Sequence, residues 1–320
     1  MFSYSSPIIE TVSIVEQSNF DIPAGISLRS ELNLRGLRFA SAHGLLHECT
    51  DGQFPSIIFG RDDNGGHGNF HPRTYERICR NQEWSKRLEK AHTASKRARV
   101  RANWQWKELD CANSSDALLM NIFCHPEVMT SAGVRAMLGI APDEVPAFGF
   151  KPRTPLRGGK RDNTEIDMRI DNLLVEAKLT EADFQSARFE LICRYRDLEA
   201  VFDVPELPVR NGKHTCYQLI RGTLAAYAME CSFCVFCDAR RPDLIEAWYK
   251  VMRTVHLFEL RCRLKLLTWQ ELAAVLPEGL QQFLLTKYGI LPAQSYVPIL
   301  DAFAVRSQAG IASFRPHNDA

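Results

Sequence analysis

The sequence has no long apolar run and no excess of charge of either sign. Its best candidate for a membrane span, GTLAAYAMECSFCVFC, is interrupted by Glu230, and no run approaches the roughly 18 apolar residues that a span needs. No membrane span is therefore expected. Lysine and arginine number 39 and aspartate and glutamate 38, so the formal net charge is +1. Binding of a nucleic acid would depend on local clusters of basic residues.

The sequence also lacks the features of a secreted or repetitive protein. Its first twenty residues contain no charged segment followed by an apolar core, and no repeat of solenoid length recurs. Ten cysteines in 320 residues favour free thiols in a reducing cytoplasm over a disulfide framework. Apolar residues make up 45% and charged residues 24%, as in globular proteins. We expect a cytoplasmic location.

One segment does concentrate positive charge. Residues 73–107 hold eleven lysines and arginines but three glutamates, and three tryptophans are interspersed among them. The segment is predicted to be helical. It favours a surface for the DNA backbone, with Trp84, Trp104 and Trp106 stacking on unpaired bases. The alternative is a solvated helix whose tryptophans lie in the core. The loop RTPLRGGKR, which leads into the next segment, is a second candidate for phosphate contacts.

The order of predicted elements indicates an α/β protein with a mixed sheet flanked by helices. From residue 111 onwards the pattern predicts helix, three strands, two helices, strand and helix, with EADFQSARFELICRYRDLEAVF as the first of the two helices after the strands. We divide the chain into an N-terminal extension, a basic helical segment, a core and a C-terminal strand, helix and tail: residues 1–72, 73–110, 111–250 and 251–320.

The stretch NTEIDMRIDNLLVEAKLT, residues 163–180, alternates polar and apolar residues and predicts a β-hairpin. Its turn would be centred on Asp171 and Asn172, since both residue types tolerate positive φ. Ile170 then faces Leu173, and paired positions sum to 343. One face of the hairpin is entirely apolar and is predicted to lie in the core: Ile166, Met168, Ile170, Leu173, Val175, Ala177 and Leu179.

The other face of the hairpin carries charge. The register places Asp167 opposite Glu176 and Glu165 opposite Lys178, with Cβ atoms roughly 5 Å apart in each pair. Like charges in this position are unfavourable unless one carboxyl is protonated or a cation lies between them. Mg²⁺ suits two carboxylates and water, and the Lys178 ammonium can orient or deprotonate that water. A solvated face with a weak Glu165–Lys178 pair is the alternative, but it leaves Asp167 and Glu176 unexplained.

These residues resemble the PD-(D/E)xK nuclease superfamily, whose fold is restriction-endonuclease-like. The motif here is Asp167, eight residues, Glu176, Ala177 and Lys178, although Ile166 stands where the name-giving proline would be. The superfamily core runs helix, three-stranded meander, helix and strand. This core is matched, if EADFQSARFELICRY is taken as an insert, by six segments of the sequence in the same order: SSDALLMNIF, FGFKPRT, TEIDMRI, LLVEAKL, CYQLIRGTLAAY and CSFCVFC. SSDALLMNIF, VEAKLTEADF and YQLIR also look like a bacterial family of such proteins, over roughly residues 75–240.

The resemblance implies roles for individual residues. Asp167 and Glu176 would bind Mg²⁺ or Mn²⁺, and Lys178 would position the nucleophile. Asp116 is the candidate for the acidic residue that the first helix often adds to the metal site. Gln218 and Arg221 would follow as polar site residues, and Glu165 and Gln218 would support the ion and the amine.

Other clusters of metal-binding residue types are weaker. Some nucleases of this superfamily carry an iron–sulfur cluster, and CSFCVFC spaces Cys231, Cys234 and Cys237 three apart. A strand would place Cys231 and Cys234 on opposite faces, so ordinary core cysteines are favoured. His43 and His47, four apart, lack the glutamate of a zinc protease motif.

We therefore expect a Mg²⁺-dependent nuclease that hydrolyses DNA phosphodiester bonds. The alternative is a catalytically silent nucleic-acid-binding protein on the same scaffold. DNA is the expected partner, and a homodimer is an option because cleavage of both strands needs two sites.

Overall fold

A mixed sheet of five strands, in the order β3-β4-β5-β8-β9, lies at the centre of the computed structural model. The structure describes residues 23–50, 56–91 and 107–293. The first three strands form an antiparallel meander, whereas β8 and β9 run parallel to β5. The five strands are β3 (Ala147–Phe150), β4 (Ile166–Ile170), β5 (Leu173–Ala177), β8 (Ser232–Cys237) and β9 (Leu264–Thr268).

The predicted hairpin is the β4–β5 pair, and its register is confirmed. Ile170 pairs with Leu173 and Met168 with Val175, so paired positions sum to 343 as expected. Asp171, in the turn, has a φ of +50°, which aspartate tolerates better than most residues. The hairpin therefore places its charged residues at the end remote from the turn.

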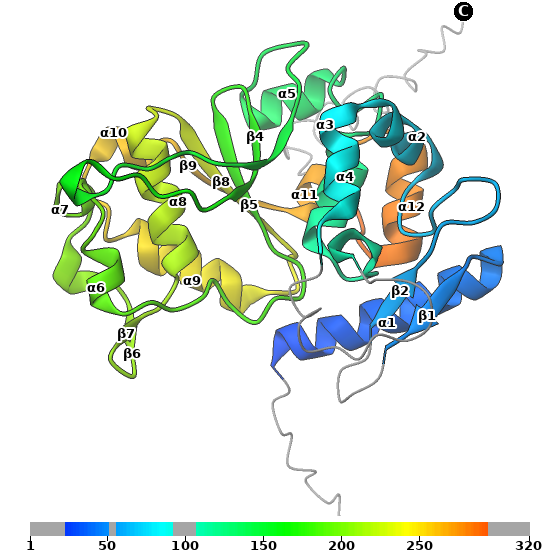
Figure 1. Cartoon of the computed structure of the whole chain (residues 1–320), viewed down its shortest axis with the longest axis horizontal. Helices are drawn as coiled ribbons and strands as arrows, with labels where there is room; N and C mark the ends of the chain where they lie inside the picture. Colours follow the sequence, from blue (N-terminus) through cyan, green and yellow to red (C-terminus); the bar gives the residue numbers. More distant parts are fainter. Residues whose placement is uncertain (1–22, 51–55, 92–106, 294–320) are drawn as a thin grey trace, which may run out of the picture.

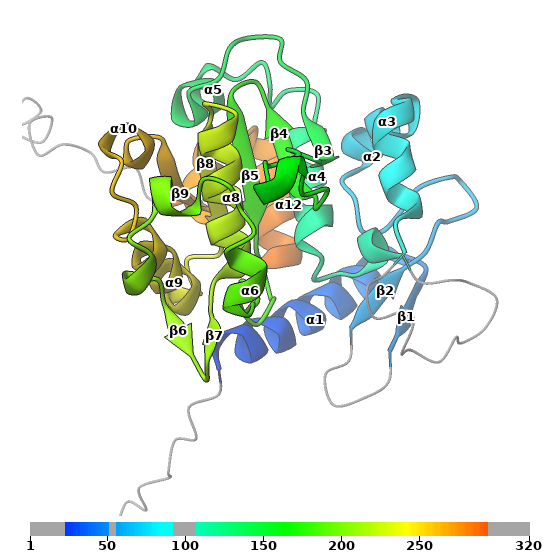
Figure 2. The same cartoon turned by 60° about the vertical axis from the view of Figure 1, so that its left-hand side comes forward.

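Helices cover both faces of the sheet (Figures 1 and 2). On one face, α8 and α9 pack on β5, β8 and β9; on the other, α4 packs on β5, and the core there extends to α12 and α1. Strands β5 and β8 are thus buried on both sides, which explains the nearly continuous apolar run of β8. The helices named are α1 (Ala24–His43), α4 (Ser115–Phe123), α8 (Tyr217–Ala228), α9 (Pro242–Met252) and α12 (Glu278–Tyr288).

Shorter elements complete the described chain. Strands β1 (His47–Cys49) and β2 (Ile57–Phe59) form a small antiparallel sheet beside α1, and β6 (Val209–Arg210) pairs with β7 (Lys213–His214). The remaining helices are α2 (Pro72–Arg80), α3 (Gln82–Ser85), α5 (Ala132–Leu138), α6 (Phe189–Ile192), α7 (Leu198–Val201), α10 (Phe258–Arg261) and α11 (Trp269–Ala273). The 3₁₀ turns are η1 (Lys86–Glu89), η2 (Glu108–Asp110), η3 (Arg157–Gly159) and η4 (Val204–Glu206).

The long helix predicted from residue 181 to residue 202 is wrong. That segment contains the single-turn helices α6 and α7, separated by irregular chain. Its backbone pairs elsewhere: Leu156 forms a bridge with Tyr195, and Ala187 forms one with His214. These long-range hydrogen bonds compete with helix formation, so tertiary context overrides local propensity.

Two side chains occupy positions other than those expected. Ile166, predicted to share a face with Met168 and Ile170, belongs to the core cluster of the α8 face, whereas those two residues belong to the cluster of the α4 face. Trp84 is buried, and its Nε1 donates to the carbonyl oxygen of Pro146 at 2.9 Å, so it cannot stack on a base. Trp104 and Trp106 lie outside the described residues.

The three cysteines of β8 and its approach are buried in the core. Cys234 packs in the α4-side cluster, whereas Cys231 and Cys237 pack in the α8-side cluster. Within the described ranges, no helix is long and apolar enough to cross a membrane.

Candidate active site

The sheet opens around Asp167. Pairing between β4 and β5 ends at Met168 and Val175, although both strands continue beyond that pair. On the other side, the β3–β4 register skips Gly149, which would face Asp167 and has a φ of +63°. Asp167 Oδ2 accepts a hydrogen bond from the backbone nitrogen of Ala177 at 2.7 Å. Where β4 and β5 separate, the Asp167 side chain thus accepts the hydrogen bond of a β5 backbone nitrogen in place of a backbone carbonyl oxygen.

Beside this opening, β5 brings a buried carboxylate and a buried amine together. Glu176 and Lys178 are 1% and 5% exposed, and they point the same way because alternate residues of a strand share a face. Lys178 Nζ donates to Glu176 Oε1 at 2.6 Å. Gln218, in the first turn of α8, donates its Nε2 to the same oxygen at 2.7 Å. Glu176 is therefore held by two donors from two elements.

A third carboxylate approaches from α4. This helix begins after Ser114, whose side chain accepts a hydrogen bond from the backbone nitrogen of Ala117. Asp116, in its first turn, is buried. Its Oδ2 accepts hydrogen bonds from Lys90 Nζ at 2.6 Å and from Arg87 Nη2 at 3.1 Å. Two cations of the basic segment thus neutralise Asp116.

Arg87 bridges two of the predicted site residues. Besides Asp116, its guanidinium donates through Nη1 to Glu165 Oε2 at 3.1 Å, and its side chain is 15% exposed. A side chain at Gly149 would collide with this guanidinium, so the glycine of β3 makes room for it. The pairing of Glu165 with Lys178 expected from the hairpin is wrong, because Glu165 turns to Arg87 and Lys178 turns to Glu176.

The electrostatics of the site follow from this crowding of carboxylates. Burial, followed by the charges of Glu176 and Asp116, raises the pKa of Asp167 well above its usual value. Burial opposes the charged form of Lys178, but the neighbouring carboxylates of Glu176, Asp167 and Glu181 outweigh it and raise the pKa of this amine. Lys178 is hence an ammonium at neutral pH, and it can orient a water but not deprotonate one. A cation beside Asp167 would favour its charged form, which burial and the neighbouring carboxylates disfavour.

The donor set fits a lightly coordinated hard cation rather than a full protein cage. Within residues 23–50, 56–91 and 107–293, no group of three or more His, Cys, Asp or Glu side chains is arranged to hold a metal ion. Mg²⁺ commonly binds proteins through one or two carboxylates and keeps several waters. Asp167, whose pKa is raised by burial and then by the charges of Glu176 and Asp116, meets that requirement together with Glu176.

The structure brings Asp116, Glu165, Asp167, Glu176, Lys178 and Gln218 into one connected cluster. Arg221 lies at its edge and donates Nη2 to the backbone oxygen of Glu165 at 3.0 Å. Arg87, Lys90 and Glu181 are members that the sequence did not single out. The density of lysine and arginine in residues 73–107 was the only signal for the first two.

The antiparallel meander followed by a parallel strand, with helices on both faces, defines a restriction-endonuclease-like protein. The model of one family, "Restriction Endonuclease associating with ARP", matches residues 42–289. Since this is more than half of the 320 residues, the chain belongs to that family. The match extends beyond residues 75–240, where the sequence motifs lie. Among curated proteins and among solved structures, none matches the chain.

Proposed function

We propose that the protein is a metal-dependent nuclease that hydrolyses DNA phosphodiester bonds. Family membership indicates a nuclease. The observation that carries the finer proposal is the Asp167 carboxylate in the opening of the sheet, beside Glu176 and with a raised pKa. A divalent ion such as Mg²⁺ or Mn²⁺, held by Asp167 and Glu176, would polarise the phosphate and supply an acidic water.

Four side chains of the cluster would assist the metal ion: Lys178, Gln218, Asp116 and Glu165. The Lys178 ammonium would orient the attacking water and offset charge on the phosphate, because its raised pKa keeps it protonated. Gln218 would hold Glu176 in place through its 2.7 Å hydrogen bond. Asp116 would join the metal site once Arg87 and Lys90 turn to another anion, and Glu165 would then keep Arg87 close to the site.

DNA is the proposed substrate because two basic side chains contact the cluster and others of the same basic segment are exposed. Arg73, Arg80 and Lys86 are more than half exposed, and Arg87 and Lys90 reach the carboxylates themselves. Phosphates are the anions that would draw Arg87 and Lys90 away from Asp116. Binding should weaken steeply with salt, since phosphate contacts release counterions.

A catalytically silent DNA-binding protein is the second candidate. It is favoured by the ion pairs of the cluster, since Asp116 and Glu176 both have cationic partners. The two functions differ in their response to a metal titration. Mn²⁺ binding that Asp167→Asn removes supports the nuclease, whereas no saturable Mn²⁺ binding supports the silent protein.

The family's name implies that its members associate with ARP. We propose the same association for this chain, tested by co-purification with ARP. Whether the nuclease acts as a monomer or a homodimer is tested by analytical ultracentrifugation with and without DNA.

The decisive experiment is cleavage of supercoiled plasmid DNA with Mg²⁺ or Mn²⁺. The wild type should nick or linearise the plasmid, and Lys178→Ala should slow this by about 10²-fold or more, the lower range for loss of a group that stabilises developing charge. Lys250→Ala is the control, because Lys250 is an exposed lysine on α9 that pairs with Glu246. Circular dichroism checks folding, and Lys178→Met, which keeps the side-chain length, replaces the alanine variant if that one unfolds. Cleavage at the wild-type rate by a folded Lys178 variant would contradict the proposal that this cluster is the nuclease active site.

A further inference from the structure

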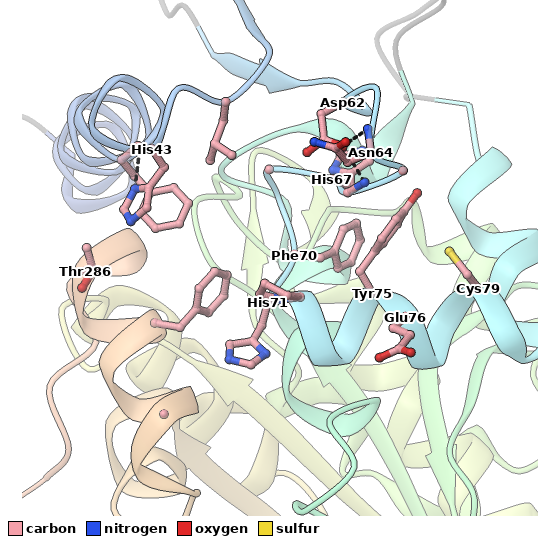
Figure 3. Close-up of a pocket in the computed structure, with 18 of the residues that line it drawn as sticks. His43, Asp62, Asn64, His67, Phe70, His71, Tyr75, Glu76, Cys79 and Thr286 are labelled. Atoms are coloured by element: carbon pink, nitrogen blue, oxygen red, sulfur yellow. Dashed lines mark hydrogen bonds between the residues drawn. The ribbon is translucent and has the colours of Figure 1, made fainter.

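A cavity of about 770 Å³ lies away from the carboxylate cluster, between α1, α2, α12 and the loop of residues 62–68. In Figure 3, His43 and Thr286 stand on one side of it and Phe70, Tyr75 and Cys79 on the other. None of its lining residues belongs to the candidate active site. Its volume is within the range of roughly 300–1,000 Å³ that small-molecule sites span.

The walls of this cavity are rich in aromatic rings. Phe70 and Tyr75 stack with ring centroids 5.5 Å apart, and they belong to the loop and to α2. Phe283 of α12 meets Phe39 of α1 edge-to-face at 5.9 Å and His71 at 5.5 Å. A planar ligand can therefore find π faces contributed by separate elements.

One residue that lines the cavity has an unsatisfied polar atom. His71 Nδ1 is buried and has no hydrogen-bond partner among the described residues. Burial, followed by the charge of Arg73, lowers the pKa of His71, so its ring is neutral and carries one donor and one acceptor. Leaving such an atom without a partner is costly, so a ligand with a polar edge would be favoured.

The other lining groups limit the class of ligand. The carboxylates of Asp62 and Glu76 line the cavity and disfavour an anion inside it. An aliphatic ligand would leave His71 Nδ1 unpaired. Arg80, at the cavity and 77% exposed, pairs with Glu76, and Arg73 on the same helix pairs with Glu127, so a phosphate outside the cavity would compete with these carboxylates for the two arginines.

We propose that this cavity binds a nucleobase. A base is planar, neutral and edged with hydrogen-bonding groups, so it matches the stacked rings, the free histidine nitrogen and the acidic lining together. The base can come from a free nucleoside or nucleotide, or it can be extruded from DNA. Only the second source rests on the proposed function, because it requires the protein to bind DNA.

Two binding measurements in EDTA distinguish these sources, since neither depends on cleavage. Isothermal titration calorimetry with adenosine and thymidine tests free bases. The fluorescence of 2-aminopurine placed opposite a mismatch in a short duplex tests extrusion. Both use the full chain and a Lys178→Ala version, so a failure of the nuclease assignment leaves the result unaffected.

Two variants link the signal to the cavity. Gly279 lines it and has open space around its Cα, so Gly279→Leu should obstruct it. His71→Phe keeps the ring but removes the polar atom. Each should weaken the binding detected at least tenfold, while Phe258→Ala, which removes an exposed aromatic ring on α10, should not. Saturable binding in either arm with this pattern supports the proposal. It is overturned by no binding in both arms, by binding that both variants leave unchanged, or by binding of tryptophan amide but not of bases.

Discussion

Replacing Asp167 by asparagine should stabilise the protein when divalent ions are absent. The asparagine can still accept the hydrogen bond from the backbone nitrogen of Ala177, because its side chain keeps an oxygen at the same position. It removes a charge that is unfavourable in the folded state, where Glu176 and Asp116 are close and the group is shielded from water. A residue proposed to bind a metal is thus expected to reduce stability until the metal arrives.

The size and sign of this effect follow from proton linkage. The pKa of Asp167 is higher in the folded chain than in the unfolded chain. Its contribution to stability is therefore present at low pH and is lost as the pH rises through the folded-state pKa. If the folded and unfolded pKa values differ by one, the free energy of unfolding changes by about 1.4 kcal/mol. Each kcal/mol moves the melting temperature by about 2–4 °C in a domain of this size. With a pKa difference of one, the asparagine variant should melt about 3 °C above wild type at pH 8.

The assay is thermal unfolding followed by circular dichroism between pH 4 and pH 9 in EDTA. The difference between the two profiles isolates Asp167, because all other titrating groups are common to both proteins. Mn²⁺ should then raise the melting temperature of the wild type but not of Asp167→Asn.

Asp162→Asn provides a matched control of opposite sign. Burial opposes ionisation of Asp162, but hydrogen bonds from Thr164 and Tyr195 outweigh it and lower its pKa, so losing this charge should destabilise the protein at pH 8. If Asp167→Asn is no more stable than wild type at pH 8, the charge of the Asp167 carboxylate is already balanced by other groups of the protein. The argument that Asp167 binds a metal ion is then refuted.

Three further outcomes are expected. Arg87→Gln should lower the free energy of unfolding by about 1–3 kcal/mol, because charge-assisted hydrogen bonds are lost. The same variant should bind Mn²⁺ more tightly in calorimetry, because Asp116 loses one of its two cationic partners. Weaker Mn²⁺ binding would contradict this. Burial, with the charge of His71 next, lowers the pKa of His125 to about 4, so its stabilising contribution is lost as the pH falls from about 6.5 towards 4. His125→Asn should flatten that part of the stability profile, and an unchanged slope would count against the assignment. Lys287→Met should cost about 1–3 kcal/mol in denaturant unfolding, because the buried oxygens of Gly68 and Asn69 lose their donor; an equally stable variant would show that the freed oxygens find other partners.

The hairpin could be predicted from the sequence because its information is local. Period-two alternation indicated which residues share a face, with Ile166 as the exception, and Asp171–Asn172 indicated the turn, so the register followed. The same register placed Asp167 and Glu176 beside each other. It could not reveal that pairing stops at Met168, just short of Asp167, since that depends on the side-chain hydrogen bond to Ala177.

The partners of the site could not be predicted because they come from distant segments. Arg87 lies 78 residues before Glu165 in the chain, and nothing in the charge pattern of residues 73–107 distinguishes it from its basic neighbours. The cavity has the same origin, since its rings come from α1, α2, α12 and a loop. For α6 and α7 the local pattern was misleading, because the backbone found long-range partners instead.

A single buried residue ties the two sites together. Asn121, on α4 behind Asp116, accepts a hydrogen bond from the backbone nitrogen of His71 at 2.8 Å and donates to the backbone oxygens of Asn69 and Ala117. One rigid helix therefore carries an acidic residue of the nuclease cluster at its start and fixes a wall of the cavity through its second turn. If DNA is cut at Asp167 and a base enters the cavity, α4 sets the separation between the two events. Such a fixed separation would let base recognition decide where along the strand cleavage falls.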